Sequence, residues 1–173
     1  PLTGIYNRRK FDELFALEFA KAQRQQKPIA MIMVDIDQFG AYAALYGNEQ
    51  RDLVLRDIAA ELKAAIQSAG DILARFDNER FALALPGMEE KSACLFAENL
   101  RLRIGTLKIA NESEAEGKLV TISLGLAVMV PEASADTHTL LSSADVALYQ
   151  ATHEGGNAAV CFSVEEGHFH TCC

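Results

Sequence analysis

The chain is short of positive charge and of long apolar runs. Its 173 residues include 16 lysines and arginines against 24 aspartates and glutamates, giving a net charge of −8. Such a surface repels nucleic acid backbones and anionic lipids, so we expect neither nucleic acid nor membrane contact. No apolar run approaches the roughly eighteen residues of a membrane span, and no basic, apolar leader opens the sequence. We therefore expect a cytoplasmic domain without an export signal.

Cysteine is also scarce, with Cys94, Cys161, Cys172 and Cys173 as the four. Cys94 falls in a helical pattern and Cys161 in an apolar, strand-like run, so both are predicted to be small buried side chains in a reducing compartment. The segment 168–173 reads HFHTCC, and histidine and cysteine are zinc ligands. Adjacent cysteines rarely serve one ion, however, so we interpret the segment as a frayed end or a linker.

The apolar content is enough for one domain with its own core. Half of the residues are hydrophobic and 23% are charged. Asn7 is a plausible N-cap for the first helix, and Gly125 is interpreted as marking a bulge or close packing. The spacing of apolar residues predicts helix, strand, helix, strand, strand, helix, strand, helix, strand. The predicted ranges are 7–26, 29–34, the stretch between Asn48 and Gly70, 72–76, 81–85, 90–107, 119–130, 136–153 and 158–162.

Three acids stand where chemistry could occur. Asp35 follows a strand predicted to be buried on both faces, which places it at the rim of the sheet, where ligands usually bind. Asp37 is two residues further on, and Glu79 lies at the tip of the predicted hairpin. Carboxylates in such a group suit a hard divalent cation. Spacing alone favours a plainer interpretation, in which acids at strand ends and turn tips are simply solvated.

Six segments carry a family resemblance, and they read LTGIYNRR (2–9), DIDQF (35–39), RFDNERF (75–81), SLGLA (123–127), ADVALYQA (144–151) and GGN (155–157). In order and with ordinary spacing, they resemble segments of the diguanylate cyclase (GGDEF) family. The resemblance covers residues 1 to about 162 and implies a domain 1–162 followed by a tail or linker, 163–173. It implies an α+β, nucleotidyl-cyclase-like fold with a ferredoxin-like core, in which helices pack over a mixed sheet of about five strands and a β-hairpin carries the signature.

The resemblance also implies roles for particular residues. Working members of the family bind GTP and magnesium, and two facing domains join two GTP molecules into cyclic di-GMP. The metal-binding acids correspond to Asp35 and Glu79, with the Ile36 carbonyl as a backbone ligand, and Glu79 is the remaining catalytic residue of the signature. Asp52 matches an acid that helps to read guanine.

The signature itself departs from the family pattern. Its place is taken by Asp77, Asn78, Glu79, Arg80 and Phe81. Asp77 and Asn78 replace two glycines, which allow close backbone approach and unusual dihedral angles. Asp77 also adds negative charge where the triphosphate should lie, and Arg80 replaces the second acid. Because Asp77 and Asn78 are good turn formers, we expect the hairpin to survive without its ligand.

Other nucleotide contacts of the family are missing as well. Gly40 stands where the family carries lysine, residues 43–44 are alanines where it carries an Asn-Asp pair, and Thr152 and Gly156 replace a late lysine and arginine. A triphosphate site without its cations loses its main electrostatic clamp. The inhibitory RxxD element keeps only Asp71, because the arginine position is serine, and arginine is the residue that grips phosphate.

We therefore expect a catalytically degenerate GGDEF domain that acts as a regulatory module in cyclic di-GMP signalling. The chain is expected to be part of a longer protein, whose other parts would carry any membrane anchor. Its expected partners are adjoining sensor or phosphodiesterase domains, or a second copy of itself. No cofactor is expected, apart from Mg²⁺ if nucleotide binds. Two alternatives stay open: an active or atypical diguanylate cyclase, and a GTP-binding pseudo-enzyme that activates an adjoining domain.

Overall fold

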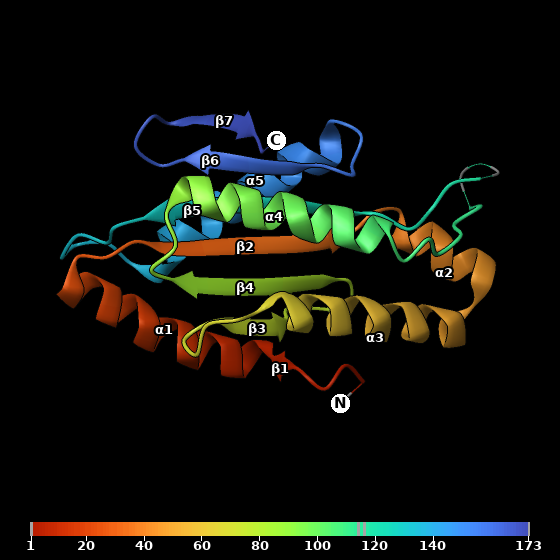
Figure 1. The fold of residues 1–173 in the computed structure, drawn as a ribbon, viewed down its shortest axis with the longest axis horizontal. Coiled ribbons are helices and arrows are strands. Elements are labelled where there is room, and N and C mark those ends of the chain that lie inside the picture. The colour runs from red at the N-terminus through yellow and green to blue at the C-terminus, as the bar shows by residue number, and fades with distance from the viewer. Residues whose placement is uncertain (1, 114, 116, 173) are drawn as a thin grey trace.

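A seven-stranded mixed sheet runs through the molecule, and the computed structural model describes residues 2–172 except 114 and 116 (Figure 1). The strand order is β1-β3-β4-β2-β5-β6-β7, in which β1–β3 and β5–β6 are parallel pairs and the other neighbours are antiparallel. The strands are β1 (Tyr6–Asn7), β2 (Ile29–Ile36), β3 (Ile72–Arg75), β4 (Arg80–Pro86), β5 (Ile122–Met129), β6 (Ala159–Ser163) and β7 (His168–Thr171).

Helices cover both faces of the sheet. Their bounds are α1 (Arg8–Gln25), α2 (Phe39–Tyr46), α3 (Asn48–Ala65), α4 (Glu90–Gly105) and α5 (Thr137–His153). One core cluster joins α2, α3 and α4 to one face, and a second joins α1 and α5 to the other. Among the described residues, none of these helices combines the length and the apolar character that crossing a bilayer requires. The predicted α+β fold, with helices over a mixed sheet, is confirmed.

Strand β2 is the centre of this arrangement. It pairs with β4 on one side and with β5 on the other, and seven of its eight residues are buried. Ala30, Ile32 and Val34 enter one core cluster, whereas Met31 and Met33 enter the other. The alternation follows from the two-residue repeat of a strand. It explains why the sequence shows an unbroken apolar run here.

Two local predictions are confirmed by contacts. The Asn7 side chain accepts a hydrogen bond from the Lys10 amide at 2.9 Å and so caps α1. Gly125 marks close packing between β5 and α5. A Cβ atom at this position would overlap the backbone of Leu148 and the carbonyl oxygen of Ala144.

The C-terminal segment differs from the prediction. The expectation of a frayed end or linker is wrong for residues 168–172, because β7 pairs antiparallel with β6, and the Cys172 amide donates to the Ala159 carbonyl at 2.8 Å. Gly167, at a φ of +68°, lies in the turn between the two strands, and its amide donates to the Ser163 carbonyl at 2.7 Å. The sheet therefore has two strands, β1 and β7, beyond the predicted five.

The cysteine prediction is half right. Cys161 is fully buried in β6, as expected. Cys94 of α4 is disulfide-bonded to Cys172, which follows β7, so it is not the free buried thiol that the helical pattern indicated. The two cysteines are 78 positions apart in the chain, and only the packing of α4 against the C-terminal strands brings them together.

Replacing Gly125 tests the contact between β5 and α5. We expect Gly125→Ala to lower the free energy of unfolding by about 3 kcal/mol, the upper end of the usual cost of overpacking. The matched control is Gly105→Ala at the end of α4, where a Cβ atom meets nothing within 4 Å. Urea denaturation would measure both variants, and equal stability of the two would contradict this account of the packing.

Candidate functional site

Asp35, near the end of β2, and Asp37, just after it, lie at one rim of the sheet. Asp35 lies opposite Arg80 of β4 and opposite Ser123 of β5. Glu79 directly precedes β4, so the same pairing brings it to the rim beside Asp35. Asp35, Asp37 and Glu79 line a common cavity of about 620 Å³, here called the rim cavity, together with parts of α2, the loop before β5 and the turn after α5. The sequence-predicted acids therefore meet in space.

Asp37 is a structural anchor. Its carboxylate accepts hydrogen bonds from the Thr121 hydroxyl at 2.7 Å, the Ser123 hydroxyl at 2.6 Å and the Asn157 amide at 2.8 Å. Gly156, at a φ of +75°, passes so close that a Cβ atom would lie 2.9 Å from an Asp37 carboxylate oxygen. Asp37 thus ties the end of β2 to β5 and to the turn after α5. It has little capacity left for a ligand.

Asp35 is the acid that stays available. Burial, followed by the nearby charges of Glu79 and Asp37, raises the pKa of Asp35 from 3.8 to about 6. Among the described residues, no group donates a hydrogen bond to this carboxylate, so burial and nearby charges are what act on it. A carboxylate held among other acids gains from a divalent cation, which would relieve the repulsion.

The rim cavity is poor in positive charge. Its lining has the three acids described above, and Lys118 is the single lysine or arginine in the described part of that lining. Gly40, Thr152 and Gly156, the positions at which the family resemblance places cations, all line the cavity and are all neutral. Lys118 was missed by sequence analysis because it lies in a polar loop with no pattern to mark it.

The hairpin turn between β3 and β4 is held by its own side chains. One Asp77 oxygen accepts from the amides of Glu79 at 3.1 Å and Arg80 at 3.0 Å, and the other accepts from the Arg80 guanidinium at 2.7 Å. Asp77 and Asn78 both keep negative φ angles, so this turn needs no glycine. The predicted β-hairpin is therefore confirmed.

Asp77 lies outside the described lining of the rim cavity. Its carboxylate is paired with Arg80 and it lines a separate pocket beside the N-terminal segment, yet its charge still raises the pKa of Asp35. Burial pushes the pKa of Asp77 up, but hydrogen bonds from the Glu79 amide and from Arg80 outweigh it and hold the pKa below its ordinary value. The acids in the described lining of the cavity are Asp35, Asp37 and Glu79, and Asp77 adds negative charge from outside that lining.

Arginine side chains connect this turn to the rest of the domain. Arg80 bonds to Asp145 of α5 at 2.9 Å, and Arg75 donates to the Asn78 carbonyl at 3.0 Å. The Arg80 guanidinium also lies over the Phe76 ring, 5.2 Å from its centroid. The Arg8 guanidinium of α1 lies over the same ring at 4.1 Å. The turn is thereby fastened to α5 and to the first turn of α1.

The remaining predicted residues lie in different places. Ile36 lines the rim cavity, whereas Phe81 is fully buried in the core. Asp52, on α3, is paired with Arg51 at 3.4 Å and is not in the described lining of the cavity. Asp71 lies away from the rim in a pocket between α3 and α4, and burial raises its pKa. The structure thus brings together Asp35, Ile36 and Glu79, but not Asp52 or Asp71.

A mixed sheet with an acid at the end of its central strand and a second acid in the adjacent hairpin turn is the architecture of a nucleotidyl-cyclase-like domain. The family model "Diguanylate cyclase, GGDEF domain" matches residues 1–158. The chain therefore belongs to the GGDEF family and is related to the diguanylate cyclases of cyclic di-GMP signalling.

Comparisons with particular proteins agree. The chain is 37% identical over 163 residues to the uncharacterized protein YhcK of Bacillus subtilis, covering 94% of this chain and 44% of that protein. It is 28% identical over 156 residues to the probable diguanylate cyclase DgcC of Escherichia coli, covering 90% of this chain and 41% of that protein. The GGDEF domain of DgcB from Caulobacter crescentus, solved in complex with c-di-GMP, superposes with a TM-score of 0.84 at 25% identity, covering 93% of each chain. The chain thus spans less than half of the two sequence relatives.

The raised pKa of Asp35 predicts a pH-dependent stability. Between pH 3.8 and about 6 the folded state holds more protons on Asp35 than the unfolded chain does, so the contribution of Asp35 to the free energy of unfolding falls as pH rises through this window. We expect Asp35→Asn to stabilise the domain at pH 7.5 by on the order of 1 kcal/mol, allowing for solvent screening, and to lose this effect near pH 4.

Urea denaturation at both pH values measures the effect. The control Asp52→Asn removes one carboxylate from α3, outside the rim cavity, and should leave the pH dependence in place. A stabilisation by Asp35→Asn that is the same at pH 4 and pH 7.5 would contradict the burial and charge repulsion assigned to this group.

Proposed function

We propose that this domain is a catalytically degenerate GGDEF module that regulates adjoining domains instead of making cyclic di-GMP. The observation that carries the proposal is the charge of the rim cavity: three acids against one lysine, with Gly40, Thr152 and Gly156 neutral. A triphosphate brings further negative charge, and phosphoryl transfer is catalysed almost entirely by positioning and by cationic stabilisation. One divalent cation between Asp35 and Glu79 would leave most of this charge unbalanced.

The hairpin turn supports the proposal from a second direction. The donors that a ligand would use there are engaged within the protein: the amides of Glu79 and Arg80 bond to Asp77, and the Arg80 guanidinium bonds to Asp77 and Asp145. A phosphate group would have to displace these contacts, and each broken charge-assisted hydrogen bond costs free energy. Such a turn maintains the fold without serving a nucleotide.

A regulatory role needs partners, and the relatives support adjoining domains. The chain spans 44% of YhcK and 41% of DgcC, so each of those proteins has further segments. One solved structure joins the GGDEF domain of DgcB to a coiled coil, and another shows the diguanylate cyclase SiaD of Pseudomonas aeruginosa with its activator SiaC. We propose that adjoining sensor or phosphodiesterase domains are the partners here.

Incubation with GTP and Mg²⁺ or Mn²⁺ tests the proposal, with chromatographic detection of cyclic di-GMP. We expect at least about a thousandfold less product than from an active diguanylate cyclase domain assayed in parallel, because losing one preorganised electrostatic contact already costs about 10²–10³ in rate. Formation of cyclic di-GMP at a comparable rate would overturn the proposal.

A repair variant separates the hairpin from the cavity. Asp77→Gly, Asn78→Gly and Arg80→Glu together restore the glycines and the second acid of the signature. We expect this triple variant to remain inactive, because the neutral positions Gly40 and Thr152 are unchanged. Activity in the triple variant would show that the cavity is competent and that the hairpin alone is degenerate.

An atypical nucleotide enzyme or GTP-binding pseudo-enzyme is the second candidate, and the availability of Asp35 favours it. Asp35 and Glu79, with the Ile36 carbonyl, would hold Mg²⁺, which supplies charge neutralisation to bound phosphates. Under this alternative, calorimetry would detect metal-dependent GTP binding that weakens in Asp35→Ala. No heat on titrating GTP with Mg²⁺ into the domain would exclude both forms of it.

A further inference from the structure

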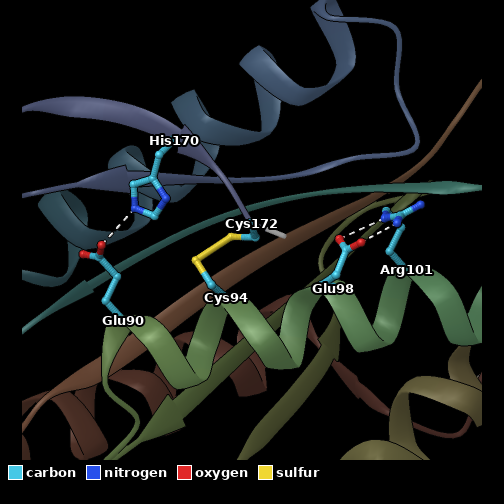
Figure 2. Close-up of a disulfide and its surroundings, with 6 residues drawn as sticks. All are labelled: Glu90, Cys94, Glu98, Arg101, His170 and Cys172. Carbon is cyan, nitrogen blue, oxygen red and sulfur yellow. Dashed lines mark hydrogen bonds and ion pairs between the residues drawn. A yellow bond between two sulfur atoms is a disulfide. The ribbon is translucent and has the colours of Figure 1, made fainter.

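Three cysteines and a histidine converge between α4 and the C-terminal strands, away from the rim cavity. Cys94 comes from α4, His170 from β7 and Cys172 from the residue after β7 (Figure 2). Cys161 comes from β6. The ligand atoms of Cys94, Cys161 and His170 all lie within 4.8 Å of one another. Cys172 is bonded to Cys94 and therefore lies at the same place. None of the four is in the described lining of the rim cavity.

The fold itself creates this convergence. Antiparallel pairing sets Cys161 directly opposite His170, and the bond from the Cys172 amide to the Ala159 carbonyl holds the end of the chain beside β6. Helix α4 packs over these strands with Cys94 facing them, at a Cα–Cα distance of 5.0 Å from Cys172. The four side chains are therefore positioned by a helix and by paired strands, which are rigid elements.

We propose that the domain with Cys94 and Cys172 as thiols contains a Cys₃His site for a zinc-class cation. Thiolate and imidazole ligands favour zinc and related soft or borderline metals over magnesium. A four-coordinate zinc with bonds of about 2.3 Å to sulfur and about 2.0 Å to nitrogen separates its ligand atoms by roughly 3.5–3.8 Å. The ligand atoms of Cys94, Cys161 and His170, which lie within 4.8 Å of one another, would have to approach each other by on the order of 1 Å to bind the metal.

Glu90 supplies the outer contact that such a site uses. The Glu90 carboxylate and His170 Nε2 are 2.9 Å apart, which fixes the ring and leaves Nδ1 for a metal (Figure 2). Histidine ligands almost always bond through their other ring nitrogen to a carboxylate, a carbonyl or water. Glu90 and Cys94 are four residues apart on α4, so one face of the helix provides both a ligand and the residue that orients another.

Two of the four proposed ligands are buried, whereas Cys94 and His170 are partly exposed. Cys161 is fully buried and Cys172 nearly so, with a relative exposure of 3%. A coordinated thiol is deprotonated outright, so metal uptake by the thiols would release protons. A closed set of four protein ligands is the pattern of a structural rather than a catalytic metal.

The disulfide and the metal site are alternatives. A sulfur in the Cys94–Cys172 disulfide has no thiolate charge and does not bind zinc as a thiolate does. A phosphine reductant converts the disulfide into two thiols, while the phosphine takes the oxygen of one water molecule and is oxidised. The site is then complete, because both sulfurs become available beside Cys161 and His170.

Cobalt(II) is the probe that tests the proposal. The phosphine-reduced protein, in a Cys173→Ser background that removes the neighbouring thiol, is titrated anaerobically with Co²⁺. We expect one equivalent to bind with a thiolate-to-cobalt charge-transfer band and the strong visible absorption of tetrahedral cobalt, both abolished by one equivalent of Zn²⁺. Cys161→Ser and His170→Ala should each weaken binding at least tenfold, and Glu90→Gln about 10–100-fold.

The matched control is His168→Ala. His168 lies on the same strand, pairs with Glu166 at 3.1 Å and is outside the cluster, so its loss should leave cobalt binding unchanged. Thiol titration first verifies that the cysteines are reduced. If the reduced protein then shows no charge-transfer band with Co²⁺, the proposal is overturned. Equal losses of cobalt affinity in His168→Ala and His170→Ala would overturn it as well. His170 is partly exposed, so its variant is expected to fold, and circular dichroism checks this. The absorption readout is independent of GTP and of the function proposed above.

Discussion

The double pairing of β2 is the constraint on which the rest of the domain depends. Its eight residues form ladders with β4 and β5, and that register decides which side chains reach the rim. Asp35 lies opposite Arg80 on one side and Ser123 on the other, and Asp37 accepts hydrogen bonds from the hydroxyls of Thr121, just before β5, and Ser123 in β5. A shift of one residue would send every apolar side chain of β2 to the wrong core. The rim geometry therefore persists for as long as the core does, whether or not a nucleotide binds there.

Fold and ligand site have separate physical supports in this domain. The Asp77 carboxylate accepts the hydrogen bonds of the amides in the signature turn, and the Arg80 guanidinium balances the charge of that carboxylate. The rim cavity, in contrast, keeps acids and lacks cations. The described lining of the cavity shares only Ile36 and Phe39 with the apolar clusters on the two faces of the sheet, so sequence change at its polar positions leaves those clusters intact. A stable GGDEF scaffold with an acidic rim is the result.

The sequence predicted the parts of the fold that repeat and missed the parts that depend on distant contacts. Periodic apolar residues marked α1 and α5, and an unbroken apolar run marked β2, but α2 reads FGAYAALY, with no polar face to reveal a helix. Strand β7 was missed because HFHT has no apolar alternation, and its position comes from pairing with β6. At the site, spacing placed Asp35 and Asp37 together but could not show that Asp37 is saturated by hydrogen bonds. Nor could it show that the charge of Asp77 is paired.

The ring of Phe76 has one more consequence. It follows β3 directly, and the guanidinium groups of Arg8 and Arg80 both rest on it, one from the first turn of α1 and one from the start of β4. Strand β1, just before α1, is also paired with β3. A displacement applied through the N-terminal segment would therefore reach the hairpin turn through packed groups, without crossing solvent. The segment that leads into α1 and the turn between β3 and β4 are therefore mechanically coupled.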